Sequence, residues 1–199
     1  MSGATQGEFR RWTFGVRAIE GQIDRATLRT TLTYRMFPRF SFGVEYNPLA
    51  TDFSPLANFL AVKETDKRPA LILGTSSDRI GTPSGQSYYA TLSKSLKKWT
   101  KLPIAPYAGA AYGTFDDKLR AIAGGNIQFT EKLSSLLIYD GVHFHPTFVW
   151  AEGRHSLMFL LAESKHPGLA YTISFDTPGR ATPPDLGPQD PFTKPGWAR

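Results

Sequence analysis

The side chains of this sequence that are best suited to chemistry are arginines, placed on segments in which polar and apolar residues alternate. A guanidinium group is permanently charged and binds carboxylates and phosphates through a planar fork of N–H donors. A row of such groups on one face of a strand predicts an interior that favours anions, or ion pairs with carboxylates such as Glu45, Glu20 and Asp24. The candidate residues facing this interior are Arg11, Arg17, Arg25, Arg29, Arg35, Arg120 and Glu45.

Two other groups of residues have the types found in metal or catalytic sites. His143 and His145 alternate along a predicted strand, but a zinc site needs further ligands and no third one is identifiable. The segment 76–78, Ser-Ser-Asp, lacks the G-x-S-x-G pattern of a nucleophile elbow and is typical of a turn. The chain has no cysteine, which excludes thiolate chemistry. We therefore expect no enzymatic activity, no metal and no cofactor.

The elements that position the arginines are predicted β-strands, because polarity alternates with period two along most of the chain. The clearest strand covers residues 25–36, a length that suits a tilted membrane strand better than a soluble one. Residues 47–57 contain two prolines and are predicted as a loop, and residues 58–64 alternate poorly.

About twelve such segments follow one another through short turns. The sequence thus predicts an all-β fold, an up-and-down antiparallel β-barrel of about twelve strands, within residues 9–176. An N-terminal segment, residues 1–8, precedes it. A Pro-rich C-terminal arm, residues 177–199, follows it and carries Phe192 and Trp197 as candidate anchors for a partner protein or a neighbouring copy.

The composition narrows the class of protein further. Aromatic residues make up 13% of the chain, which favours sheet over a helical bundle. No apolar run is long enough for a membrane-spanning helix. The net charge of +6 suits an anionic partner such as an acidic polysaccharide. Nucleic acid is not expected, because most aromatic side chains lie on the face opposite the arginines.

Alternation alone leaves open which face of the strands lies inside. In a membrane barrel the apolar row faces lipid, whereas in a soluble barrel or sandwich it forms the core. Long strands and a polar row rich in Gly, Ser, Thr, Asn and Gln favour the membrane. So do large aromatic residues near predicted strand ends, namely Trp12, Tyr34, Phe40, Tyr46, Trp99 and Trp150.

Residues 168–175 alternate Leu169, Tyr171, Ile173 and Phe175 with smaller side chains, and this segment resembles the last strand of a bacterial outer-membrane barrel. Much of residues 40–175 also resembles part of the YjbH-type family of outer-membrane proteins, which implies a link to exopolysaccharide biosynthesis. The chain is much shorter than a full member of that family. The residues that carry the resemblance are Val44-Glu-Tyr-Asn-Pro48, Arg68-Pro-Ala-Leu-Ile-Leu-Gly74 with Gly81-Thr82, Tyr89, Pro106-Tyr107 with Gly109 and Gly113, and Asp140-Gly141.

Together these observations predict a non-enzymatic integral outer-membrane β-barrel that acts as an anchor or narrow channel in an envelope assembly. Its expected partners are outer-membrane lipid, an anionic polysaccharide and a protein bound through residues 177–199. Residues 1–9 have no apolar signal-peptide core, so an outer-membrane location expects a processed N-terminus. The alternatives are a soluble ligand-binding β-barrel and a structural subunit that assembles through its C-terminal arm.

Overall fold

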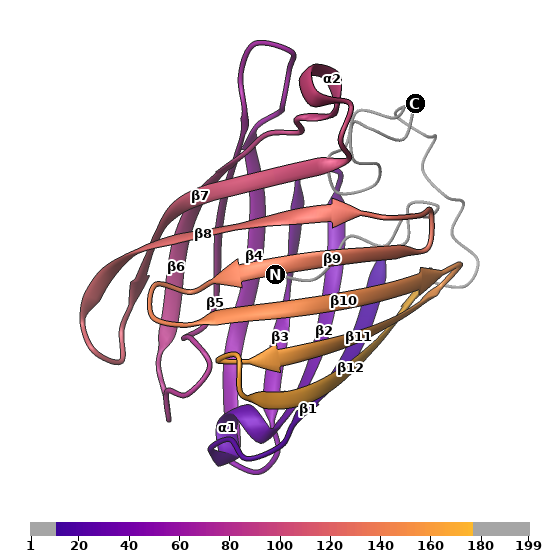
Figure 1. Cartoon of the computed structure of the whole chain (residues 1–199). Coiled ribbons are helices and arrows are strands. Elements are labelled where there is room, and N and C mark those ends of the chain that lie inside the picture. The colour runs from indigo at the N-terminus through magenta and orange to yellow at the C-terminus, as the bar shows by residue number, and fades with distance from the viewer. Residues whose placement is uncertain (1–10, 177–199) are drawn as a thin grey trace.

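Twelve antiparallel strands, joined in chain order, close into a single barrel (Figure 1). The computed structural model describes residues 11–176. Because β1 pairs with both β2 and β12, the sheet has no free edge within these residues. The predicted all-β, up-and-down antiparallel barrel is confirmed. Its strands are β1 (Trp12–Ile19), β2 (Leu28–Phe37), β3 (Phe40–Asn47), β4 (Asp52–Val62), β5 (Ala70–Ser77), β6 (Gln86–Ser93), β7 (Ile104–Gly113), β8 (Lys118–Gln128), β9 (Leu133–Tyr139), β10 (Phe144–Glu152), β11 (His155–Ala162) and β12 (His166–Phe175).

The barrel has two chemically different ends. At the terminal end, Trp12 at the start of β1 pairs with Phe175 at the end of β12, and helix α2 (Lys97–Thr100) lies nearby. At the opposite loop end, helix α1 (Asp24–Thr27) connects β1 to β2 (Figure 1). In this view β7–β11 run across β2–β5, as tilted strands on opposite walls of a barrel must.

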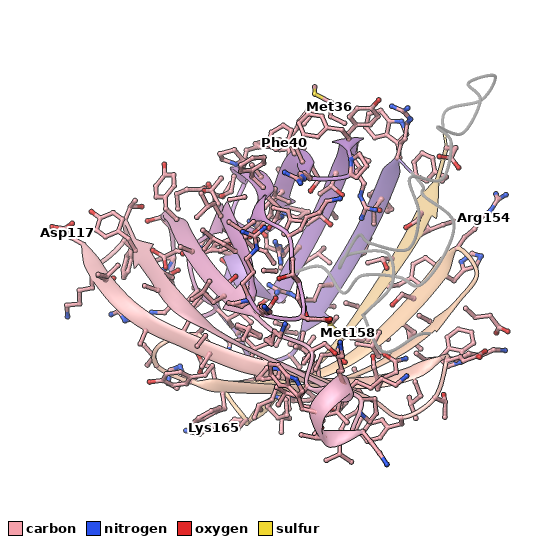
Figure 2. All side chains as sticks on the ribbon, turned by 90° about the horizontal axis from the view of Figure 1, so that it is seen from above. Met36, Phe40, Asp117, Arg154, Met158 and Lys165 are labelled. Atoms are coloured by element: carbon pink, nitrogen blue, oxygen red, sulfur yellow. The ribbon has the colours of Figure 1, made fainter. Side chains whose placement is uncertain are left out.

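The apolar row of each strand faces outward. Directly paired residues lie on the same face of a sheet, and Phe14 pairs with Leu32 on one side and with Ile173 on the other. Phe14 and Leu32 are 39% and 38% exposed, whereas inward-facing Glu45 is 2% exposed. The view into the barrel from the terminal end shows Met158 within the ring of strands and Arg154 at its periphery (Figure 2).

A small apolar core lies inside the barrel at the loop end. Ile19, Leu160 and Ala162 are nearly fully buried, and Ile80 packs against them. Ile80 belongs to the loop between β5 and β6, residues 78–85, which therefore lies against the inside of the barrel mouth. This apolar contact is the first feature that closes the loop end.

Two predicted boundaries were wrong. Residues 25–27 form the single turn of α1, in which the Ala26 and Thr27 amides donate to the Ile23 carbonyl at 2.8 and 2.9 Å. A single helical turn is too short to disturb the period-two alternation of polar and apolar residues, which continues into β2. Residues 52–57, expected in a loop, begin β4. Pro55 is tolerated there because the β4–β5 ladder starts at Ala57, so its missing N–H removes no bond from that ladder. No helix within residues 11–176 is long and apolar enough to cross a membrane.

Candidate functional site

The interior of the barrel contains most of the residues that the arginine pattern selected. Arg17 on β1 lies directly opposite Arg29 on β2, and both side chains point inward. Glu45 on β3 and Arg120 on β8 also face inward, and all four line one internal cavity of about 280 Å³. Sequence alternation thus brings together residues from three neighbouring strands and from the far wall of the barrel.

Arg29 and Glu45 form a buried ion pair between Arg29 Nη2 and Glu45 Oε2. Asn47 Nδ2 donates a further hydrogen bond of 3.1 Å to Glu45 Oε1. Glu45 and Asn47 are 2% and 0% exposed. A carboxylate buried this deeply needs a charged partner, because removing one member of such a pair costs about 3–5 kcal/mol. Glu45 therefore serves chiefly to neutralise Arg29.

Arg17 differs from Arg29 because it has no carboxylate partner. No ion pair and no side-chain hydrogen bond of Arg17 is present within residues 11–176, and its Nε atom is buried without a partner. The charged groups that act on it are Arg29, Glu45 and Arg25, two cations and one anion. Pairing with Glu20 or Asp24, which the sequence left open, does not occur for this residue.

Arg25 fastens the 78–85 loop into the barrel mouth. Its Nη1 donates to the carbonyl and hydroxyl oxygens of Thr82 at 3.0 and 2.9 Å, and its Nη2 donates to the Gly85 carbonyl at 2.8 Å. Arg25 Nε also pairs with Asp52 Oδ2 at 3.0 Å. Arg25 and Thr82 are 5% and 1% exposed. The sequence placed Arg25 on a strand; it is in fact presented by α1, and it closes the loop end.

A second ionic group lies beside the loop at this end. Arg120 holds the Asp116 carboxylate with both terminal nitrogens, one of them at 2.8 Å, and Arg79 Nη2 lies 3.7 Å from the same carboxylate. The hydrogen bond from Arg120 lowers the pKa of Asp116 below its usual value, against a small opposing effect of burial. Arg120 is thus ion-paired with Asp116, a carboxylate that it shares with Arg79.

His145 lies buried between the β9–β10 loop and the start of the β11–β12 turn. The Glu163 amide donates to His145 Nδ1 at 3.0 Å, so this nitrogen carries no proton and the Nε2–H donates to Asp140 Oδ2 at 2.9 Å. Burial alone would raise the pKa of Asp140. Hydrogen bonds from His145 and from the His143 and Val142 amides outweigh it and lower that pKa.

The predicted placement of His143 and His145 on one strand face was wrong. His143 precedes β10, in the loop that Gly141 turns with a φ of 96°, and its Nδ1 lies 3.5 Å from Glu163 Oε1. Polar and apolar residues alternate with period two through this loop and into β10, so the pattern did not mark where the strand begins. Within residues 11–176, no group of three or more His, Asp or Glu side chains could hold a metal ion.

The other predicted site residues lie away from the cavity. Arg11 precedes β1 and donates from Nη1 to the Tyr34 hydroxyl at 3.0 Å, at the terminal end. Arg35 faces inward near the same end, paired in register with Ser41. Phe192 and Trp197 lie outside the described residues. The structure therefore brings together Arg17, Arg25, Arg29, Arg120 and Glu45 and leaves the remaining predicted residues apart.

Sequence reasoning missed three residues of the site. Thr82 had no periodic signal, because it lies in an irregular loop and meets Arg25 only through folding. Tyr107 points into the cavity and its hydroxyl is buried without a partner. One sequence signal could have identified Tyr107, because it is a large residue in an inward row of small residues. In the structure its ring lies over Gly124. Met158 lines the cavity from β11, where an apolar strand gave no sign of which residues faced inward.

Comparison with known proteins adds nothing to these assignments, which rest on the geometry of the structure. No model of a known protein family matches the chain, and no curated protein matches it significantly.

Proposed function

We propose that this protein is an integral β-barrel of the bacterial outer membrane, acting as an anchor or a narrow channel in an envelope assembly. One observation carries the proposal: the apolar row faces outward on the strands of a closed barrel whose interior is charged and polar. A soluble barrel has the opposite arrangement. The side chains involved are large, and Leu119, Phe53 and Phe148 are 73%, 65% and 52% exposed.

Charge is almost absent from the outward rows. The strand registers place Glu152, the last residue of β10, as the one Asp, Glu, Lys or Arg on the outward face of β1–β12. A sheet face in water normally carries many Lys and Glu residues, and contiguous apolar patches of this extent mark contact with lipid or another apolar surface. Lipid covers the apolar outward face around the whole circumference of the barrel, whereas a protein partner covers one side of it.

Aromatic side chains gather near both ends of the outward face. Near the terminal end, Trp12 and Tyr34 lie with ring centroids 4.7 Å apart. Near the loop end, Tyr46 stacks on Phe53 at 4.3 Å, and Tyr139 packs against Phe144 at 4.8 Å. Aliphatic residues such as Leu32 and Val44 lie between these clusters. Two aromatic girdles that flank an aliphatic band are typical of membrane barrels.

The height of the band fits a bilayer. A ten-residue strand such as β2, rising about 3.3 Å per residue and tilted by about 40°, spans roughly 25 Å. Both ends of the described chain lie at the terminal end, which is the periplasmic side in bacterial barrels with an even number of strands. The loop closed by Arg25 would then face the exterior. A loop held against this mouth by Arg25 supports an anchor or a narrow channel over a wide pore.

The test is where the protein partitions. The chain is expressed behind a signal peptide, the membranes are fractionated, and the protein is extracted with and without detergent. We expect outer-membrane recovery, extraction only with detergent, and faster migration of the unheated folded barrel on a gel. A monodisperse protein in detergent-free buffer would contradict the membrane proposal. Co-purification of an acidic polysaccharide, detected by uronic acid assay, tests the polysaccharide link separately.

A further inference from the structure

The interior contains one arginine that forms no ion pair and no side-chain hydrogen bond within the described residues. Arg29 is paired with Glu45, Arg25 with Asp52, and Arg79 and Arg120 with Asp116. Arg17 lines the same cavity with no such partner in the described chain, and its Nε is buried. A guanidinium does not lose its proton in proteins, so Arg17 keeps its charge inside the barrel. Its guanidinium is therefore a cation without a direct anionic partner on the cavity wall.

Three further donors in the cavity are also unsatisfied. Arg29 Nε, Arg79 Nε and the Tyr107 hydroxyl are buried without hydrogen-bond partners, and all three residues line the cavity with Arg17. Buried donors without acceptors are rare in folded proteins and call for a bound group that supplies the missing oxygens. Four unsatisfied donors on the lining of one cavity favour an anion as its occupant.

Apolar side chains line part of the cavity wall. Arg17 pairs in register with Ala170, and Ala170 pairs with Met158, so the wall turns from cationic to apolar within two strands. Met158 projects into the ring of strands in Figure 2. Ile122 and Ile138 continue this apolar wall on β8 and β9. The volume of about 280 Å³ lies near the lower limit of about 300 Å³ for small-molecule sites.

We propose that the cavity binds a small organic monocarboxylate, with its carboxylate on Arg17 and its apolar body against Met158, Ile122 and Ile138. One guanidinium without an ion-pair partner suits a monoanion, and a planar carboxylate matches the guanidinium fork. The Tyr107 hydroxyl and Arg29 Nε complete the set of donors. The site lies inside a closed barrel, so the inference does not depend on whether lipid or water surrounds the outer face.

The test is a titration of the folded full-length protein with benzoate, in detergent or in plain buffer, whichever keeps it folded, without added chloride. Acetate supplies the charge without the apolar body, benzamide supplies the body without the charge, and glucuronate supplies a polar body. We expect benzoate to bind at one site per chain by calorimetry, at least tenfold more tightly than each of the other three. Bound benzoate also raises the thermal unfolding midpoint.

Variants separate a binding role of Arg17 from a structural one. Arg17→Gln should weaken benzoate binding at least tenfold, yet raise the unfolding midpoint of the ligand-free barrel, because a partly buried charge without an ion-pair partner is removed. Arg17→Lys keeps the charge but loses the fork, and should bind benzoate with intermediate affinity. Arg154→Gln removes an equal charge from the exposed β10–β11 turn and should leave binding unchanged.

Three results would overturn the proposal. One is benzoate binding no tighter than benzamide or acetate, and another is equal benzoate affinity in wild type and Arg17→Gln. The third is glucuronate binding more tightly than benzoate, which would assign the cavity to acidic sugars. A lower unfolding midpoint of ligand-free Arg17→Gln would show that Arg17 is satisfied within the barrel and would also count against the site.

Discussion

Arg25 and Thr82 lie 57 residues apart in the chain, yet the Arg25 guanidinium donates to both the carbonyl and the hydroxyl oxygen of Thr82, at 3.0 and 2.9 Å. The Thr82 hydroxyl in turn donates to the Arg79 carbonyl at 2.8 Å. A charged side chain on a one-turn helix thus holds the backbone of a distant loop in a closed shape. The loop end is closed by this contact together with Ile80, which packs on the apolar core.

The first prediction concerns release of this loop. Arg25→Gln removes the ion pair with Asp52 and the charge-assisted bonds to the loop, and should lower the free energy of unfolding by about 3 kcal/mol. The freed loop exposes Arg79, so limited trypsin digestion should cut after Arg79 while the barrel stays folded. Urea unfolding and mass spectrometry of the fragments measure the two effects.

Lys98→Gln is the matched control, because it removes an equal charge from an exposed ion pair with Asp66 at the other end of the barrel. It should alter neither stability nor cleavage at Arg79. Equal cleavage at Arg79 in wild type and Arg25→Gln would show that Arg25 does not hold the loop.

The second prediction is a pH dependence that arises from Asp140. Hydrogen bonds from His145 and two amides lower its pKa in the folded protein below the unfolded value of about 3.9. The unfolded state therefore binds the proton more readily, and stability increases with pH in this range. The contribution of Asp140 is fully present well above pH 4 and is lost as the pH falls through the lowered pKa.

Urea unfolding between pH 3 and pH 7 measures this effect. Asp140→Asn should be less stable than wild type at pH 7, and the two stabilities should converge at the acid end. A constant stability difference across the whole range would mean that ionisation of Asp140 does not contribute.

The sequence was sufficient to predict the strands but not the contacts that hold the barrel together at its loop end. Side chains on a strand alternate with period two, so the position of Arg17 and Arg29 on the polar face of their strands followed from spacing alone. Antiparallel hairpins in chain order made the up-and-down topology the simplest solution. Which row faced inward was undecided, because a lipid-facing and a core-facing apolar row read alike in sequence; the exposure of Leu119 resolves it.

The failures have a common physical origin. Arg25, Thr82 and His143 lie in a helical turn or in loops, where no period links sequence to direction. Their partners are brought together by barrel closure, a long-range event that local patterns do not encode. The cavity was missed for the same reason, because Met158 on β11 and Tyr107 on β7 line one cavity only once the barrel has closed.

The third prediction uses two adjacent glycines on β8. A Cβ atom on Gly124 would lie 2.2 Å from the Leu137 carbonyl oxygen and 2.5 Å from the Tyr107 hydroxyl. Backbone cannot yield as a flexible side chain can, so Gly124→Ala should cost about 2–3 kcal/mol of stability or prevent barrel closure. A Cβ on Gly125 would find its nearest atom at 3.6 Å, so Gly125→Ala should fold normally. Refolding yield and urea unfolding compare them, and equal stability of the two variants would contradict the packing of Tyr107 over Gly124.

The fourth prediction distinguishes lipid from water around the barrel. Leu32 lies midway along β2 and Met36 near its terminal end, and both are exposed on the outer face, at 38% and 49%. In a bilayer, arginine costs about 2–4 kcal/mol at the midplane and about 0–1 kcal/mol near the interface. Leu32→Arg should therefore destabilise the barrel in phospholipid vesicles far more than Met36→Arg.

Both substitutions place the same charge on the same strand and the same face. The two variants therefore differ in the depth of that charge in the bilayer. In water the guanidinium remains hydrated at either position, so a soluble barrel would show two small and similar losses. Urea unfolding in vesicles, followed by tryptophan fluorescence, gives both free energies. A difference of more than about 1 kcal/mol in the expected direction supports a bilayer around the barrel, and equal losses would exclude it, because no depth-dependent solvent would then surround β2.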